Sequence, residues 1–267
     1  MTFSSTSPST GIESTSSSAD SITAFDEILT LYLLSKNTVM TELDSLIGKD
    51  PEMPIAHLFR SYLLKLASDP RFKHAALASL HAAQKLPMNQ REQIHSAALN
   101  AWFDGDTKKT TRLLEELLRQ YPEDILALKI AHHLHFYSGN AEEMRNSIAR
   151  VTNHYQADHP FFGFVLGMHS FGLEESGEYR QAEKLGRTAV ELNPDDQWAA
   201  HSVAHVMQME SRFSDGVAWT SSVLPSWEKT NNFIFHVHWH QALFYLGQND
   251  LDAALSIYDS QLTAPLK

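Results

Sequence analysis

The 267-residue chain contains no cysteine. Disulfide bonds, thiolate metal sites and a cysteine nucleophile are therefore excluded. Basic residues are also scarce, because 21 lysines and arginines stand against 32 acidic residues and give a formal net charge of −11. Nucleic acids and anionic membrane surfaces both attract a basic face, so this balance argues against either as a partner.

Long apolar runs are missing as well. No stretch approaches the roughly 20 apolar residues that a membrane-spanning helix needs. Residues 1–21 are rich in Ser and Thr, and they have neither the apolar run of a secretory signal nor the arginines of a mitochondrial transit peptide. We therefore expect a soluble, cytoplasmic protein that begins with a disordered Ser/Thr-rich tail over 1–21. A phosphorylatable regulatory segment is the alternative for this tail.

Several catalytic signatures are missing too. The chain has no GxSxG, HExxH, GxGxxG or GxxxxGK motif, so a nucleophilic serine elbow, a zincin-type metalloprotease helix and a glycine-rich phosphate loop are not indicated. Runs of alternating β-branched residues are absent. Instead, from about residue 22 onward, apolar residues recur at spacings of three and four, which indicates helices throughout.

The helices follow a period of about 34 residues. Gly105 precedes Pro122 by seventeen residues, and Gly177 precedes Pro194 by the same number. A helix–turn–helix unit of this length is typical of tetratricopeptide repeats (TPRs). We therefore predict an all-α, right-handed α-solenoid of TPR-like helical hairpins over 22–267. About seven hairpins are expected, at 22–49, 54–87, 90–123, 124–157, 160–195, 197–231 and 232–264.

The clearest repeat is GEYRQAEKLGRTAVELNPDD, residues 177–196. Tyr179 and Ala182 are expected at the tight crossing of its hairpin, Ala189 beneath the next repeat, and Pro194 after its second helix. Small residues at such crossings allow two backbones to approach closely.

Longer phrases carry a more specific resemblance. They include LHFYSGN, GVAW, NNFIFHVHWHQALF and the stretch from FFGFVLGMHSFGLEESGEYRQAEKLG to HSVAHVMQM. Through them the chain, from about Phe25 onward, resembles the tetratricopeptide repeat protein thirty-eight family. The resemblance implies an α-solenoid of degenerate repeats. It also implies that the chain lacks a C-terminal part, because that family continues further. No reaction is attached to the family.

Histidines are concentrated on the predicted first helices of four consecutive hairpins. Nine of the 15 histidines lie there: His132, His133, His135, His169, His201, His205, His236, His238 and His240. In HVHWH, all three histidines would share one face of a strand, whereas on a helix only His236 and His240 do. Because this segment is predicted to be helical, we expect His238 to face elsewhere.

Two histidine pairs are spaced four residues apart: His201 with His205, and His236 with His240. This spacing places two imidazoles on one face of a helix, where they can bind one metal ion. Glu174 and Glu175 on the preceding first helix could add a carboxylate ligand or a general base. Three interpretations stay open: histidines that only pack, a ligand-binding groove without metal, and a zinc site formed by the two pairs.

The leading functional hypothesis is a scaffold that binds a protein, a peptide or a small molecule in a concave groove. Neither nucleic acid nor membrane is expected as a partner, and no cofactor is expected apart from zinc in the metal alternative. The rival hypothesis is a metal-dependent or acid–base enzyme that uses the His/Glu cluster. The predicted groove residues are His133, Tyr137, Phe171, Glu174, Glu175, His201, His205, His236 and His240.

Overall fold

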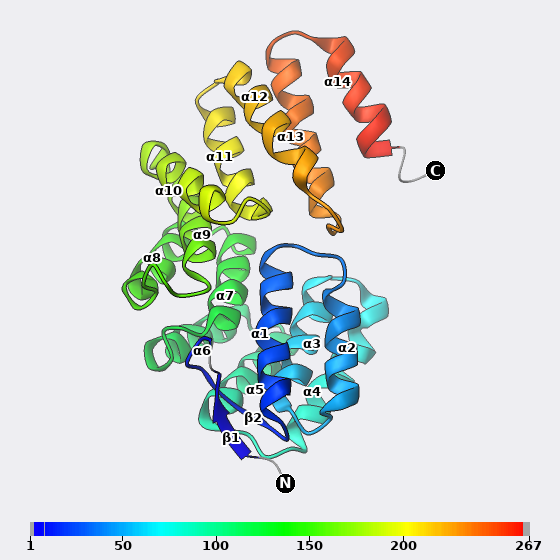
Figure 1. The fold of residues 1–267 in the computed structure, drawn as a ribbon, viewed down its shortest axis with the longest axis vertical. Coiled ribbons are helices and arrows are strands. Elements are labelled where there is room, and N and C mark those ends of the chain that lie inside the picture. The colour runs from blue at the N-terminus through cyan, green and yellow to red at the C-terminus, as the bar shows by residue number, and fades with distance from the viewer. Residues whose placement is uncertain (1–2, 8, 264–267) are drawn as a thin grey trace. The chain divides into compact units, whose positions relative to one another are not determined.

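The computed structural model describes residues 3–7 and 9–263. Helices follow one another along the chain, as Figure 1 shows. The described residues form two compact units. Unit 1 comprises 38–161 together with the N-terminal residues up to Leu31, and unit 2 comprises 32–37 and the residues from Phe162 onward.

Unit 1 begins with a two-stranded hairpin and continues as helices. Its strands are β1 (Phe3–Thr6) and β2 (Glu13–Ser16). Its helices are α1 (Ala19–Leu33, of which the last residues count with unit 2), α2 (Val39–Lys49), α3 (Pro54–Leu66), η1 (Pro70–Phe72), α4 (Lys73–Gln84), α5 (Gln90–Phe103), α6 (Thr107–Gln120), α7 (Ile125–Tyr137), α8 (Ala141–Val151) and η2 (Thr152–His154). Consecutive helices pack in pairs, α3 with α4, α5 with α6 and α7 with α8.

The N-terminal hairpin differs from the disordered tail expected over 1–21. β1 and β2 are antiparallel, with Thr6 opposite Glu13. The hydroxyl groups of Ser7 and Ser9 donate to the carboxylate of Asp26 on α1. A segment with few apolar side chains cannot be held by hydrophobic burial, but here carboxylates of the helices accept hydrogen bonds from its hydroxyl groups. Composition alone does not reveal such partners.

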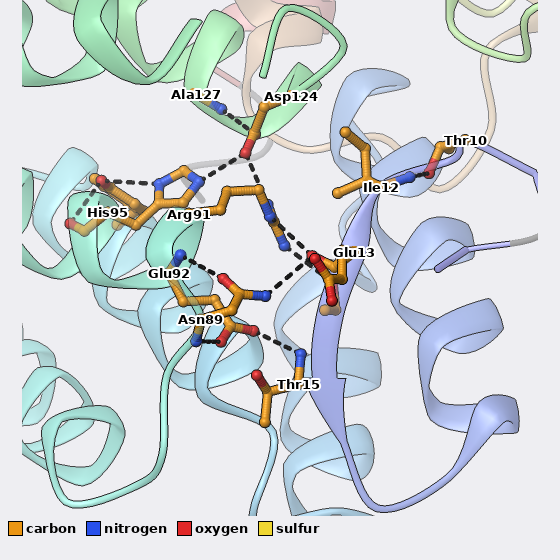
Figure 2. Close-up of polar contacts among 12 residues, drawn as sticks. Thr10, Ile12, Glu13, Thr15, Asn89, Arg91, Glu92, His95, Asp124 and Ala127 are labelled. Atoms are coloured by element: carbon orange, nitrogen blue, oxygen red, sulfur yellow. Dashed lines mark hydrogen bonds and ion pairs between the residues drawn. The ribbon is translucent and has the colours of Figure 1, made fainter. Parts of the chain in front are cut away.

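Arg91, at the start of α5, joins β2 to a buried ion pair (Figure 2). Its guanidinium donates to the carbonyl oxygen of Glu13 at 3.1 Å, to Ser14 Oγ at 2.9 Å and to Asp124 Oδ2 at 2.7 Å. His95 Nε2 lies 3.0 Å from the same oxygen of Asp124. Burial raises the pKa of the Asp124 carboxyl, but the charges of His95 and Arg91 outweigh it and hold the pKa well below its usual range.

Asn89 and Glu92 form a capping box at the start of α5, each side chain binding the other's backbone N–H. The same two side chains also bind β2. Glu92 Oε1 accepts from the backbone N–H of Thr15 at 2.9 Å, and Asn89 Nδ2 donates to the carbonyl oxygen of Glu13. Three side chains at one helix terminus therefore bind the main chain of β2 (Figure 2).

Unit 2 consists of three helical hairpins. Its elements are α9 (Phe162–Glu175), α10 (Tyr179–Leu192), α11 (Gln197–Met209), α12 (Phe213–Val223), η3 (Leu224–Ser226), α13 (Phe233–Gly247), α14 (Leu251–Ile257) and the π-helical η4 (Tyr258–Thr263). The first helices of successive hairpins also pack together, α9 with α11 and α11 with α13. The predicted arrangement of consecutive helical hairpins is confirmed over the described residues.

The repeat over 177–196 has the expected local structure. Ala182 and Ala189 are fully buried on α10, and Tyr179 packs against Ala182 and its neighbours. Gly177, between α9 and α10, has a φ of +79°, a conformation that favours glycine. α10 ends at Leu192, two residues before Pro194. Small residues and turn residues therefore determine this hairpin as the pattern indicates.

Among the described residues, no helix has both the length and the hydrophobicity needed to cross a bilayer.

Candidate functional site

Four of the predicted groove histidines meet in unit 2. His201 and His205 lie one turn apart on α11, and His236 and His240 lie one turn apart on α13. Because α11 and α13 pack against each other, the two pairs face one another. One ring nitrogen from each of the four lies within 4.8 Å of the others. His238 is not part of this set, as the helical spacing predicts.

We call these four residues the histidine cluster. His236 Nε2 is 2.9 Å from His201 Nε2 and 3.2 Å from His240 Nε2. The ring centroids of His201 and His205 are 4.1 Å apart, and those of His205 and His240 are 4.6 Å apart. His201 and His240 are buried, whereas His205 and His236 are half-buried. The Nε2 atoms of His201, His236 and His240 thus lie close to one another.

A carboxylate on α9 contacts the cluster from outside. Glu174, which is 4% exposed, places Oε2 3.3 Å from Nδ1 of His205. The other nitrogen of this ring, Nε2, is buried and has no hydrogen-bond partner among residues 3–7 and 9–263. A carboxylate on one imidazole nitrogen leaves the other available for a metal ion, which is the usual arrangement of metal-binding histidines.

Burial favours the neutral imidazole at two of the cluster residues, His236 and His240. Burial, together with the neighbouring His205 and His236, lowers the pKa of His240 to about 2. Burial and His205 also lower the pKa of His236. Protonated imidazole cannot bind a metal, so these shifts leave lone pairs available at neutral pH.

Aromatic rings surround the cluster. Phe171 on α9 contacts His201 and His205 with ring centroids 5.4 and 5.5 Å away. Phe233 lies 5.1 Å from His201, and Trp239 stacks on His236 at 5.4 Å. Trp239 is 45% exposed, so this ring borders the cluster on the solvent side.

Glu175 lies at the edge of the site. It is exposed, and one of its oxygens forms a group with Glu174 and His205 in which ligand atoms lie within 4.8 Å of one another. Burial and the adjacent Glu174 raise the pKa of the Glu175 carboxyl, although His205 opposes this. A carboxyl with a raised pKa beside an imidazole is the kind of group that general acid–base catalysis uses.

Two predicted groove residues belong to the other compact unit. His133 and Tyr137 are on α7 in unit 1, where their rings stack with centroids 6.2 Å apart. Tyr137 is 66% exposed. The sequence pattern treats every first helix alike, so it does not show which compact unit carries each residue.

Sequence reasoning missed Phe233 as a neighbour of the cluster, and it missed the network of Arg91, His95 and Asp124 in unit 1. The letters NQRE at 89–92 do carry the pattern of a capping box, an amide followed three residues later by Glu. That pattern could have predicted the start of α5. It could not have predicted the contact with β2, which is 76 to 78 residues away along the chain.

No family model matches this chain. Solved structures resemble it at low sequence identity. A tetratricopeptide repeat protein from Parabacteroides merdae matches with a TM-score of 0.52 and 15% identity, over 91% of this chain and 92% of that one. A protein from Podosopora anserina with nearly identical TPR-like repeats matches with a TM-score of 0.51 and 12% identity, over 65% of this chain and 94% of that one. These likenesses show that the chain has a TPR-like repeat fold.

Proposed function

We propose that this chain is a TPR-like binding scaffold whose unit 2 holds a divalent transition-metal ion, zinc in the first place, at His201, His205, His236 and His240. The observation that carries the proposal is the convergence of four imidazole nitrogens within 4.8 Å. Zinc bonds imidazole at about 2.0–2.1 Å, so the corners of a zinc tetrahedron lie roughly 3.3 Å apart. The Nε2 separations of 2.9 and 3.2 Å around His236 suit that size.

Packing alone accounts less well for the cluster. Without a metal, His236 Nε2 hydrogen-bonds to the Nε2 atoms of His201 and His240, and the buried Nε2 of His205 has no hydrogen-bond partner among the described residues. A buried polar atom without a partner costs about 1–3 kcal/mol. One ion would satisfy all four nitrogens. The outer contact between Glu174 and His205 supports the same assignment.

A complete set of four nitrogen ligands is typical of metal sites that organise structure, whereas catalytic zinc keeps a position for water. This favours a binding scaffold over an enzyme. We propose that the partner, a protein, peptide or small molecule, contacts the exposed Trp239 and Glu175 beside the metal. Exposed aromatic side chains next to a rigid site are common anchors in interfaces.

The first experiment measures metal in the full chain purified without a histidine tag. Inductively coupled plasma mass spectrometry is expected to find about one zinc per chain, and His201→Ala and His240→Ala are each expected to lose it. His238→Ala, on the same helix but outside the cluster, is the matched control and should retain the ion. A metal-free protein that takes up neither zinc nor cobalt on titration would refute the metal site.

The enzyme remains the second candidate because Glu175 has a raised pKa beside His205. X-ray absorption of the zinc-loaded protein separates the two functions. Four imidazole nitrogens and no oxygen would support the scaffold, whereas three imidazoles and one water would favour a hydrolytic centre with Glu175 as general base.

We also propose that the chain is a member of the tetratricopeptide repeat protein thirty-eight family. The support is the resemblance of several long phrases of this chain to that family, among them the segment that contains His236 and His240. A cytoplasmic location stays a prediction from the sequence.

A further inference from the structure

The buried carboxylate of Asp50 holds the end of the N-terminal hairpin. Asp50 caps the C-terminal end of α2 and is 1% exposed. It accepts hydrogen bonds from Ser16 Oγ at 2.6 Å, from the backbone N–H of Ser17 at 3.0 Å and from Ser17 Oγ at 2.7 Å. Among the described residues, no lysine or arginine forms an ion pair with Asp50, so hydroxyl and amide donors stabilise its charge.

Ser17 differs from the other hydroxyl residues of this strand end. Ser14 and Ser16 are buried, whereas Ser17 is exposed. It is followed by Ser18 and Ala19 and then by Asp20, in the first turn of α1. A serine on the surface just before a helix is accessible to an enzyme, and an acidic residue three positions later is a common recognition feature for acid-directed serine kinases.

We propose that Ser17 is a phosphorylation site and that its phosphorylation releases the N-terminal hairpin from unit 1. A protein kinase transfers the γ-phosphoryl group of ATP to Ser17 Oγ: the new bond joins oxygen to phosphorus, the bond to ADP breaks, and the hydroxyl proton is released. That proton is the one that Ser17 donates to Asp50. The hydroxyl donor of Ser17 is thus replaced by a phosphate with a charge of about −1.5 to −2, and the Asp50 carboxylate repels this phosphate.

The Asp50 carboxylate and a phosphate on Ser17 would both be negatively charged at neutral pH. Burial raises the pKa of the Asp50 carboxyl, but the hydrogen bonds from Ser16 and Ser17 outweigh it and lower the pKa. Asp50 is therefore ionised at neutral pH, when the phosphate is also charged. The backbone N–H of Ser17 also binds Asp50, so the phosphate lies next to the carboxylate as long as the strand end stays docked. Separating the two charges therefore moves the strand end away from Asp50.

The helix side chains that β2 contacts keep their contacts with one another when β2 moves away. Arg91 keeps its ion pair with Asp124, and Asn89 keeps the capping box with Glu92. Release breaks the hydrogen bonds of these side chains to the main chain of Glu13 and Thr15 (Figure 2). Release therefore uncovers groups that bind an extended main chain while the helices of unit 1 stay folded.

The absence of cysteine makes release directly measurable. Thr15→Cys places one thiol in the full chain at a buried side chain, and leaves the backbone N–H that binds Glu92. Phosphoserine is installed at position 17 during translation, and the rate of reaction with a thiol reagent is recorded. We expect at least a tenfold faster reaction than in the unphosphorylated chain. Phosphoserine at position 68, an exposed serine between α3 and η1, is the matched control and should leave the rate unchanged.

Asp50→Asn tests whether repulsion by the Asp50 carboxylate causes the release. With the carboxylate removed, phosphoserine at position 17 should accelerate thiol labelling less than about threefold, because the repulsion is gone. Equal acceleration with Asp50 and with Asn at position 50 would overturn the mechanism, and no acceleration in either would overturn the release. Deuterium exchange of the backbone amides over 13–17 in the cysteine-free chain gives the same answer if Thr15→Cys weakens the fold.

Access by a kinase is tested separately. The full chain is incubated with an acid-directed serine kinase and ATP, and the modified residue is located by tandem mass spectrometry. Phosphate on Ser17 supports the site. Phosphorylation of a synthetic peptide of residues 9–20 without phosphorylation of the chain would show that the docked segment is protected and would overturn it.

Discussion

At the level of single residues, the imidazole of His205 connects the Glu174 carboxylate on α9 with the other histidines of the cluster. Its Nδ1 faces the Glu174 carboxylate, and its ring packs against the rings of the three other histidines of the cluster. The carboxylate is expected to orient the ring and increase the electron density on Nε2. Glu174 would therefore act on the metal through His205.

Glu174→Gln should weaken zinc binding by about 10- to 100-fold, the usual effect of removing such an outer carboxylate. Isothermal titration calorimetry of the apo protein with zinc measures the change. Glu175→Gln removes the same charge from the next position and should change the affinity by less than about threefold. An equal loss in both variants would show that general negative charge, and not the contact with His205, attracts the ion.

The depressed pKa of His240 predicts a pH dependence of stability. In the unfolded chain this imidazole titrates near its ordinary value of 6.5, whereas in the folded chain its pKa is about 2. Below pH 6.5 the unfolded state therefore binds more protons, and the metal-free protein loses stability as pH falls. At pH 5 one such histidine costs about 2 kcal/mol, and well above pH 6.5 it costs nothing.

Urea unfolding of the metal-free protein at a series of pH values measures this dependence. His240→Gln should reduce the slope of the unfolding free energy against pH between 5 and 6.5, because one proton-linked group is removed. An unchanged slope in His240→Gln would mean that the imidazole can be protonated in the folded state.

At the element scale, the small residues decide how closely helices pack. A Cβ built on Gly216 of α12 would lie 2.4 Å from the ring of Phe244, which is fully buried on α13. This close approach lets α12 pack on the helix that carries His236 and His240. The same pattern occurs at Ala182 and Ala189 on α10, which the repeat signature does predict.

Gly216→Ala should destabilise the protein by about 1–3 kcal/mol through overpacking against Phe244. Gly48 in α2 is the matched control, because a Cβ there would meet no atom within 4 Å. Gly48→Ala should stabilise by about 0.5–1 kcal/mol, since alanine favours the helix. Urea unfolding of both variants should give opposite signs, and a stabilising Gly216→Ala would contradict the packing argument.

At the scale of the whole molecule, a metal that binds only the folded state stabilises the part of the chain that holds it. Zinc at 100 times its dissociation constant should add about 2.7 kcal/mol. Because all four ligands lie on α11 and α13, deuterium exchange should slow over 197–209 and 233–247 on adding zinc. The amides of α3 and α5 in unit 1 should not change. Uniform protection of both units would point to non-specific zinc binding.

The helical hairpins and the two histidine pairs can be predicted from the amino-acid sequence alone. Helix periodicity, turn glycines and small crossing residues act over one or two turns, so they can be recognised without knowing the fold. The spacing of His201 with His205, and of His236 with His240, follows from the same 3.6-residue period. The pattern also indicated Glu174 and Phe171 as neighbours, through the stacking of successive first helices.

The distance between the two histidine pairs and the docking of the N-terminal segment depend on how the helices pack. Whether two histidine pairs 35 residues apart approach to 2.9 Å depends on how α11 packs against α13, and periodicity does not determine that distance. The N-terminal segment shows the same limit: its composition predicts disorder, yet Asp26, Asp50, Arg91 and Glu92 supply partners from distant helices. Hydrogen bonds and ligand geometry need groups placed to within tenths of an ångström, and only the packed fold provides that.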